Sequence, residues 1–136
     1  MRKAFLSLAV ALIAVGAPAF SMTAASASGP TLGCNIQPSG NDNFTSTCGT
    51  GDPSSSYGVT YEVQGTSGTV TYAWTPPSSG TVTSGCTSTS STCSISVRGL
   101  EQDQRLTATV IVTDNGSPST LSSTAIINAV CGDEFC

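Results

Sequence analysis

Thr69-Val-Thr-Tyr-Ala-Trp-Thr-Pro-Pro77 is the segment around which the rest of this chain is expected to pack. Val70, Tyr72 and Trp74 alternate with small or polar residues, which is the period of two of a half-buried β-strand. The two prolines must end that strand, because proline has no N–H to contribute to a ladder. Trp74 is the only tryptophan of the chain, and one such ring buries roughly 200 Å². We therefore predict a central strand with Trp74 nearly fully buried, with a ligand-stacking role as the alternative.

Further segments show the same alternation of apolar and polar residues. They are residues 57–65, 93–99, 105–114 and 120–130, with a shorter segment at 81–84 that is expected at a sheet edge. The predicted core residues are Trp74, Tyr72, Val70, Val110 and Val112. About seven short strands indicate an all-β fold, a single antiparallel β-sandwich whose core lies in residues 57–130.

The connections between these strands also have recognisable patterns. Asn115-Gly116 predicts a tight hairpin, because this pair tolerates positive φ, and Asp114 is expected to cap that turn. Gly65-Thr-Ser-Gly68 is expected to be a hairpin connection into the Trp74 strand. Residues 33–48, with a turn cluster at 38–42, predict an N-terminal hairpin. Residues 98–104 are expected to form a turn of helix or a loop.

The first 27 residues have the pattern of a secretory signal peptide. A positive start, Met1-Arg-Lys3, precedes an apolar stretch over residues 4–20, and Ala25-Ser-Ala27 offers a cleavage site. The apolar stretch is too short and interrupted for a stable membrane span. We therefore expect a secreted, extracellular or periplasmic protein with one mature domain over residues 28–136.

Thr31-Leu-Gly-Cys34 resembles a bacterial lipobox, which would anchor the chain through a lipid on Cys34. A polar spacer separates this cysteine from the apolar stretch, and Thr31 replaces the usual leucine. Lipidation would also leave an odd number of cysteines in a secreted chain. We therefore favour a protein without a membrane anchor.

The charge balance excludes several kinds of partner. Without residues 1–27, two arginines, Arg98 and Arg105, stand against eight carboxylates, a formal net charge of −6. Nucleic acids and anionic membranes require basic patches, so neither is an expected partner. We expect a monomer that meets an unknown protein or glycan at the cell exterior.

Six cysteines in an exported chain predict disulfides rather than zinc or thiol chemistry. The central position of the turn cluster favours Cys34–Cys48, and the symmetric Ser/Thr loop between Cys86 and Cys93 favours a second local pair. Cys131 and Cys136 would form the third, since Gly132 lets the chain double back. Fifteen connectivities exist for six cysteines. The rival arrangement joins Cys34 and Cys48 to Cys131 and Cys136.

Catalysis is restricted by the residues that are missing. The chain has no histidine, which excludes Ser–His–Asp and Cys–His catalysis and HExxH zinc sites. No lysine follows residue 27, which excludes a Ser–Lys dyad. A carboxylate pair across a cleft is the remaining option, and so small a sandwich has little room for one. We expect no catalytic residue, no cofactor and no metal site, with weak Ca²⁺ binding at Glu101 and Asp103 or at Asp133 and Glu134 as the alternative.

Two stretches resemble bacterial immunoglobulin-like domains, most closely the polycystic-kidney-disease (PKD) type. They are Tyr72-Ala-Trp74 and Ala108-Thr-Val-Ile-Val-Thr-Asp-Asn-Gly116 with the strand after it, which are similar to strands C, F and G. The resemblance covers residues 57–130. It implies an immunoglobulin-like sandwich with a binding, adhesive or spacer role, and it implies no catalytic residue. Thr75-Pro-Pro-Ser-Ser79 departs from the acidic, Gly-rich turn of PKD domains.

Two functions fit these observations. The first is a secreted, non-catalytic immunoglobulin-like binding or structural module. The second is a small disulfide-rich inhibitor or effector that inserts a surface loop, residues 86–93, into its target. The tip of that loop, Thr87-Ser-Thr-Ser-Ser-Thr92, carries no Arg, Lys or bulky apolar side chain, which favours the module.

Overall fold

The computed structural model describes residues 29–38 and 43–136, and within these residues the protein consists of strands with no helix. The predicted signal peptide and most of the predicted turn at 38–42 lie outside the described residues. Eight strands form two sheets of four, and two further short strands form a hairpin. The described part therefore has ten strands where the sequence predicted about seven.

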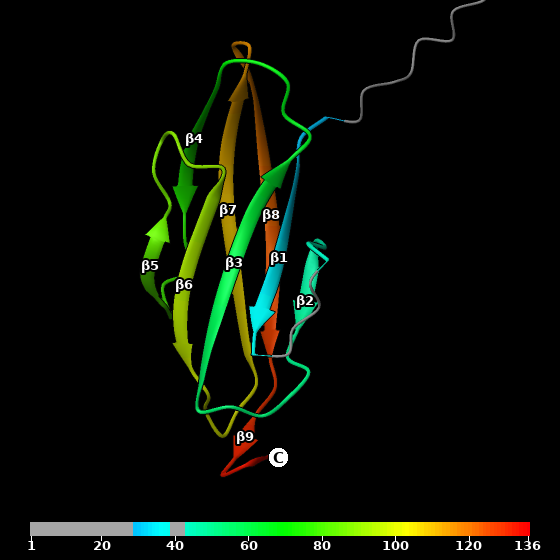
Figure 1. The fold of residues 1–136 in the computed structure, drawn as a ribbon, viewed down its shortest axis with the longest axis vertical. Coiled ribbons are helices and arrows are strands. Elements are labelled where there is room, and N and C mark those ends of the chain that lie inside the picture. The colour runs from blue at the N-terminus through cyan, green and yellow to red at the C-terminus, as the bar shows by residue number, and fades with distance from the viewer. Residues whose placement is uncertain (1–28, 39–42) are drawn as a thin grey trace, which may run out of the picture.

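The first sheet has the order β1-β3-β6-β5, and all its strand pairs are antiparallel (Figure 1). Its strands are β1 (Thr31–Gln37), β3 (Ser56–Gln64), β6 (Thr92–Arg98) and β5 (Thr81–Gly85). The predicted strands at 57–65 and 93–99 are each present within one residue at both ends. As predicted, β5 lies at a sheet edge.

The second sheet has the order β2-β8-β7-β4. Its strands are β2 (Thr47–Gly49), β8 (Ser117–Ile127), β7 (Gln104–Asp114) and β4 (Val70–Thr75). β2 pairs in parallel with β8, and the other pairs are antiparallel. β4 ends directly before Pro76, as the two prolines require. The hairpin between β7 and β8 turns at Asn115 and Gly116, both with positive φ (50° and 82°).

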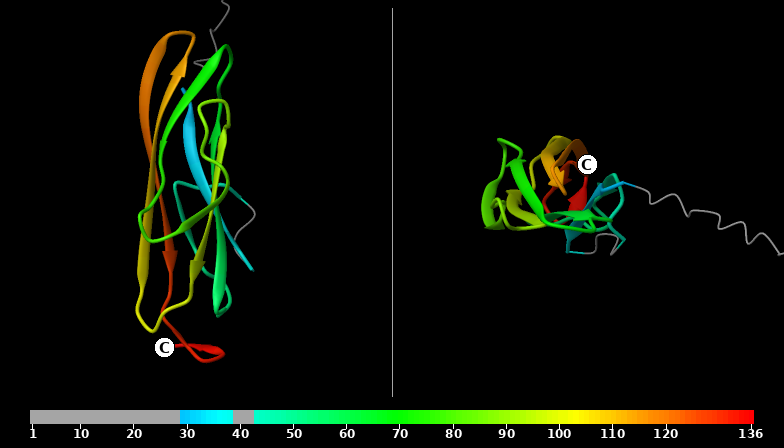
Figure 2. Two further views of the ribbon diagram at one scale, coloured as in Figure 1. Left: turned by 90° about the vertical axis from the view of Figure 1, so that its left-hand side faces the viewer. Right: turned by 90° about the horizontal axis from the view of Figure 1, so that it is seen from above.

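The two sheets lie face to face in a sandwich, and Figure 2 shows the two layers from the side. The inward side chains of β3 alternate as predicted and are buried together with those of β7. They are Tyr57, Val59, Tyr61 and Val63 on β3 and Leu106, Ala108, Val110 and Val112 on β7. Strands β1-β3-β6-β5 facing β4, β7 and β8 have the order of an immunoglobulin constant-type domain.

The prediction of a central, nearly fully buried Trp74 strand is wrong. β4 is an edge strand that pairs only with β7, and Trp74 is partly buried against the core. Central and edge strands share the same period of two when one face is buried, so the alternation alone does not distinguish them.

The prediction of an N-terminal hairpin over residues 33–48 is also wrong. β1 belongs to the first sheet and β2 to the second. The one backbone bridge of the predicted hairpin lies before β2, where Cys34 N–H donates to the Thr45 carbonyl at 2.8 Å. β2 pairs instead with β8, where Cys48 lies opposite Ala125 and both are buried. A Cβ at Gly33 would lie 2.6 Å from the Phe44 backbone, so this crossing requires a glycine in β1.

Two connections, predicted as a hairpin connection and as a turn of helix or a loop, cross between the sheets. Residues 65–69 join β3 of the first sheet to β4 of the second, so they are not a hairpin connection. Residues 99–103 cross from β6 to β7 as a loop without helix. The predicted strand at 120–130 ends at Ile127, and the chain then forms the separate hairpin of β9 (Val130–Cys131) and β10 (Glu134–Phe135).

Candidate functional site

The six cysteines form the three local pairs that the sequence favoured, and none of the described cysteines is free. Cys34–Cys48 joins β1 to β2 across the two sheets, with a Cα–Cα distance of 5.7 Å. This disulfide therefore does not link the two strands of a hairpin, contrary to the prediction from the sequence. Cys86–Cys93 closes the β5–β6 connection, and Cys131–Cys136 closes the terminal hairpin.

The loop between Cys86 and Cys93 lies against the free edge of β4. Tyr72 N–H donates to the Ser88 carbonyl at 3.0 Å, and the indole Nε1–H of Trp74 donates to the Ser90 carbonyl at 2.9 Å. These bonds satisfy the Trp74 side chain and one backbone group of the β4 edge. The loop therefore covers this edge at Tyr72 and Trp74 and does not project freely into solvent.

The predicted core residues do not all have the same environment. Val110 and Val112 are fully buried, and Tyr72 is 9% exposed. Val70 and Trp74 are partly buried and pack against the core from the edge strand. The rings of Tyr72 and Trp74 stack at a centroid distance of 6.4 Å. Trp74 is thus held by protein groups on several sides, which favours a packing role over ligand stacking.

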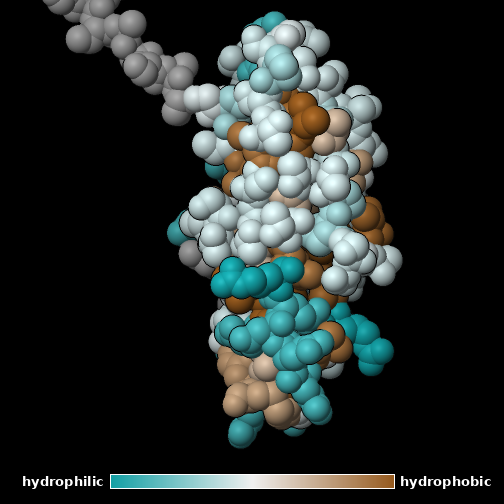
Figure 3. Space-filling view, turned by 180° about the vertical axis from the view of Figure 1, so that it is seen from behind, coloured by the Kyte–Doolittle hydropathy of each residue, from teal (hydrophilic) through white to brown (hydrophobic). Residues whose placement is uncertain are grey.

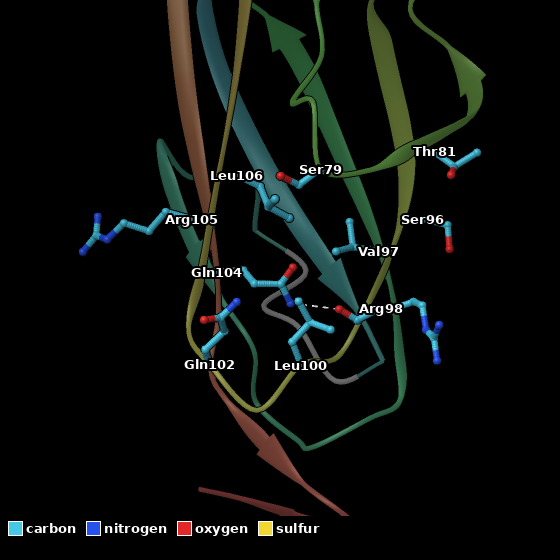
Figure 4. Close-up of a pocket in the computed structure, with 10 residues that line it drawn as sticks. All are labelled: Ser79, Thr81, Ser96, Val97, Arg98, Leu100, Gln102, Gln104, Arg105 and Leu106. Carbon is cyan, nitrogen blue, oxygen red and sulfur yellow. Dashed lines mark hydrogen bonds between the residues drawn. The ribbon is translucent and has the colours of Figure 1, made fainter.

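A cavity of about 480 Å³ opens between the sheets below the end of β4 (Figure 4). Its volume lies in the range of small-ligand sites. The lining residues come from β5, β6, β7 and the loops before β5 and after β6: Ser79, Thr81, Ser96, Val97, Arg98, Leu100, Gln102, Gln104, Arg105 and Leu106. Val97 and Leu106 are buried, whereas Leu100 is 42% exposed. The cavity thus has an apolar floor and a rim of amides and hydroxyls.

Hydrogen bonds fix both walls of this cavity. The Tyr61 hydroxyl of β3 donates across the sandwich to the Leu106 carbonyl at 2.8 Å, and burial raises the pKa of this phenol above its ordinary value. Gln104 Nε2 donates to the Arg98 carbonyl at 2.8 Å, which ties β7 to β6 (Figure 4). The apolar floor is therefore held in place from two strands.

The charged groups at the cavity are both cations. Arg98 and Arg105 line it, and no carboxylate is among the lining residues. Their guanidinium groups point away from each other, on opposite sides of the opening (Figure 4). The two arginines therefore do not bind one anion together. The lining residues also include no carboxylate pair of the kind that glycoside hydrolysis requires.

Most charged residues of the described part of the chain lie at one end of the sandwich, in loops, at strand ends and in the terminal hairpin. They are Asp52, Arg98, Glu101, Asp103, Arg105, Asp133 and Glu134. The outer face of the β2-β8-β7-β4 sheet is pale over its upper part, where serine and threonine dominate, and hydrophilic at its lower end (Figure 3). The end of the molecule that holds the cavity is thus also its charged end.

Two of the carboxylates that the sequence considered, Asp114 and Asp103, have structural partners. Asp114 does not cap the Asn115-Gly116 turn, because its Oδ2 accepts from Ser67 N–H at 3.0 Å in the crossing loop. Asp103 Oδ1 accepts from Ala129 N–H at 2.8 Å and so positions the start of the terminal hairpin. In the part of the chain that the structure describes, no three His, Cys, Asp or Glu residues lie together as metal ligands would.

Sequence reasoning did not single out the cavity. Its polar side chains, such as Gln102 and Gln104, belong to no motif. One sequence signal could have indicated the cavity, namely the difference in length between two paired strands. Two prolines end β4 after six residues, whereas β7 runs for eleven.

No protein-family model, curated protein or solved structure matches this chain. Within residues 29–38 and 43–136, no helix has the length and apolar character needed to cross a membrane.

Proposed function

We propose that this protein is a secreted, non-catalytic, immunoglobulin-like module of the PKD-like type that binds a protein or glycan outside the cell. The sandwich and its strand order support the class of module. Three disulfides are compatible with an oxidising extracellular or periplasmic environment. The signal-peptide pattern of residues 1–27 supports secretion.

The observation that carries this proposal is the chemistry of the cavity. It combines an apolar floor with neutral amides and hydroxyls, the composition of a recognition site. The chain has no histidine to act as a general base for its many serines. Binding without turnover is the function that such a set of side chains supports best.

The alternative is an inhibitor or effector that acts through the 86–93 loop. An inserted loop must stand away from the scaffold, whereas the Ser88 and Ser90 carbonyls of this loop accept hydrogen bonds from β4. Its tip also offers no large anchor side chain. Both observations favour the module.

The test uses the purified, disulfide-bonded protein. It is exposed to a glycan array, to a phage-displayed random peptide library, and to panels of ester, peptide and glycoside substrates. We expect saturable binding to one ligand class and no turnover. Hydrolysis that persists through repurification and is lost on an Asp→Asn or Glu→Gln change would contradict the proposal. So would failure of both libraries to yield a ligand.

A further inference from the structure

β7 extends well beyond the strand that pairs with its outer side. β4 pairs with β7 only from Thr109 to Asp114, while β8 pairs with β7 along its whole length from Gln104 to Asp114. β4 is the last strand of this sheet. The segment from Gln104 to Ala108 therefore has a strand on one side and none on the other.

The direction of the free backbone groups follows from the pairing of β4. Tyr72 N–H points away from β7, since it donates to Ser88, so its pair with Val112 is the non-hydrogen-bonded type. Antiparallel pairs alternate, so Thr109, Ile111 and Thr113 direct their backbone groups toward β4. The same alternation continues along β7 beyond the end of β4. Arg105 and Thr107 therefore direct their N–H and C=O groups to the side without a strand.

The cavity lies directly against this free edge. Gln104, Arg105 and Leu106 form one wall of it, and Val97 of β6 lies across from them. Figure 4 shows Leu106, Val97 and Leu100 directed into the space between the strands. An extended chain that pairs with the free edge would thus place alternate side chains over this apolar floor.

Charge indicates what such a chain would carry. Arg98 and Arg105 are the two cations of the described residues, and both line this cavity, on opposite sides of its mouth. No carboxylate is among the lining residues. An extended segment with acidic residues at its two ends would therefore meet one arginine on each side.

We propose that this groove binds an extended peptide segment of a partner protein, which adds a short strand to β7 in line with β4. The segment would insert an apolar side chain between Val97, Leu100 and Leu106 and place acidic residues near Arg98 and Arg105. Backbone pairing provides affinity and the side-chain pocket provides selectivity, as in other cases of strand addition to a sheet edge. This inference rests on the proposed binding function and names the partner class for it.

The first experiment selects peptides from a phage-displayed random library on the wild-type protein. Ser79→Trp places a large ring at the rim of the cavity, at an exposed position. Thr120→Trp is the matched control, an exposed residue outside the lining. We expect enriched peptides with an apolar residue between acidic ones, retained by Thr120→Trp and lost by Ser79→Trp.

The second experiment tests pairing and charge on one selected peptide. N-methylation of the peptide amide opposite Arg105 removes one backbone hydrogen bond and should weaken binding roughly two- to tenfold. Arg98→Gln or Arg105→Gln should weaken it roughly two- to fivefold and reduce its salt dependence. In hydrogen exchange, the Arg105 and Thr107 amides should become protected when the peptide binds.

Several results would overturn the groove assignment. They are no enriched peptide, equal enrichment on Ser79→Trp, cationic rather than acidic peptides, or unchanged exchange at Arg105 and Thr107. Concentration-dependent dimers that Ser79→Trp abolishes would assign the groove to a second copy of this chain instead. If a glycan binds and Ser79→Trp retains that binding, the proposed function stands and the groove assignment fails. If neither library yields a ligand, both fail.

Discussion

Trp74 is held at the edge of the sandwich by packing and by one hydrogen bond. Its ring packs against the core without being fully buried, and its indole Nε1–H donates to the Ser90 carbonyl at 2.9 Å. An aromatic residue with an apolar body and a polar atom suits such a position. The residue therefore stabilises both its own strand and the loop that covers it.

Trp74→Phe should lower the free energy of unfolding by about 1 kcal/mol, because it removes the bond to Ser90 and keeps most of the packing. Trp74→Ala should lower it by about 2–3 kcal/mol, less than for a fully buried ring. Urea unfolding measures both. Val82→Ala, at a side chain that is 47% exposed, is the control and should change stability by less than about 0.5 kcal/mol. Equal effects of the Phe and Ala variants would refute a separate role for the hydrogen bond.

Tyr61 makes stability depend on pH in the alkaline range. Burial raises its pKa in the fold, while in the unfolded chain the phenol titrates near 10. Above this pH the unfolded state loses the proton before the folded state does, so it binds fewer protons and stability falls as pH rises. This residue's contribution is fully present below about pH 10.

Tyr61→Phe should therefore reduce the fall in unfolding free energy between about pH 10 and 11.5, where one group contributes at most about 1.4 kcal/mol per pH unit. It should also cost about 1–2 kcal/mol at pH 7, since the Leu106 carbonyl loses a donor. Urea midpoints at a series of pH values give both quantities. An unchanged alkaline slope in the variant would show that Tyr61 is not the group responsible.

At the scale of elements, the Cys86–Cys93 loop completes the edge of a neighbouring sheet. β5 and β6 belong to the first sheet, yet carbonyls of the loop between them accept hydrogen bonds from β4 of the second. An uncovered edge strand is a site for unwanted pairing. The loop therefore protects β4 on the side where no described strand pairs with it.

Replacing Cys86 and Cys93 together by serine should lower the unfolding free energy by roughly 2–3 kcal/mol in the loop-entropy model. Hydrogen exchange should then accelerate at the Tyr72 amide, because its acceptor lies in the released loop. The paired substitution of Cys131 and Cys136 is the control and should leave the Tyr72 amide unchanged. Equal acceleration at Tyr72 in both double variants would contradict a local role for the loop.

For the whole molecule, Cys34–Cys48 is the covalent link between the two sheets. β1 and β2 lie in different layers, and each pairs with a strand of its own sheet. Cys34 and Cys48 are both buried. The other two disulfides close local loops of seven and five residues, while this one spans fourteen.

Replacing Cys34 and Cys48 together by alanine should therefore be the most destabilising of the three disulfide removals, by about 3 kcal/mol or more. The loss combines a larger loop in the unfolded chain with weakened packing between the layers. Thermal unfolding of the three double variants under one condition gives the order. If the Cys131–Cys136 variant loses more stability than this one, the inter-sheet role is refuted.

The sequence alone determined the positions of β3, β4, β6 and β7, because alternation, prolines and Asn-Gly are local signals. β3, β6 and β7 lie where the period of two placed them, and β4 stops at its prolines. The three favoured disulfide pairs are present, but the turn argument holds only for Cys86–Cys93 and Cys131–Cys136, since Cys34–Cys48 joins two sheets and not the strands of a hairpin. Only the tertiary structure decided which sheet each strand joins, since an edge strand and a central one share the same local pattern. For that reason the edge position of Trp74, the separation of β1 from β2, and the free edge of β7 beside its cavity could be found only in the folded molecule.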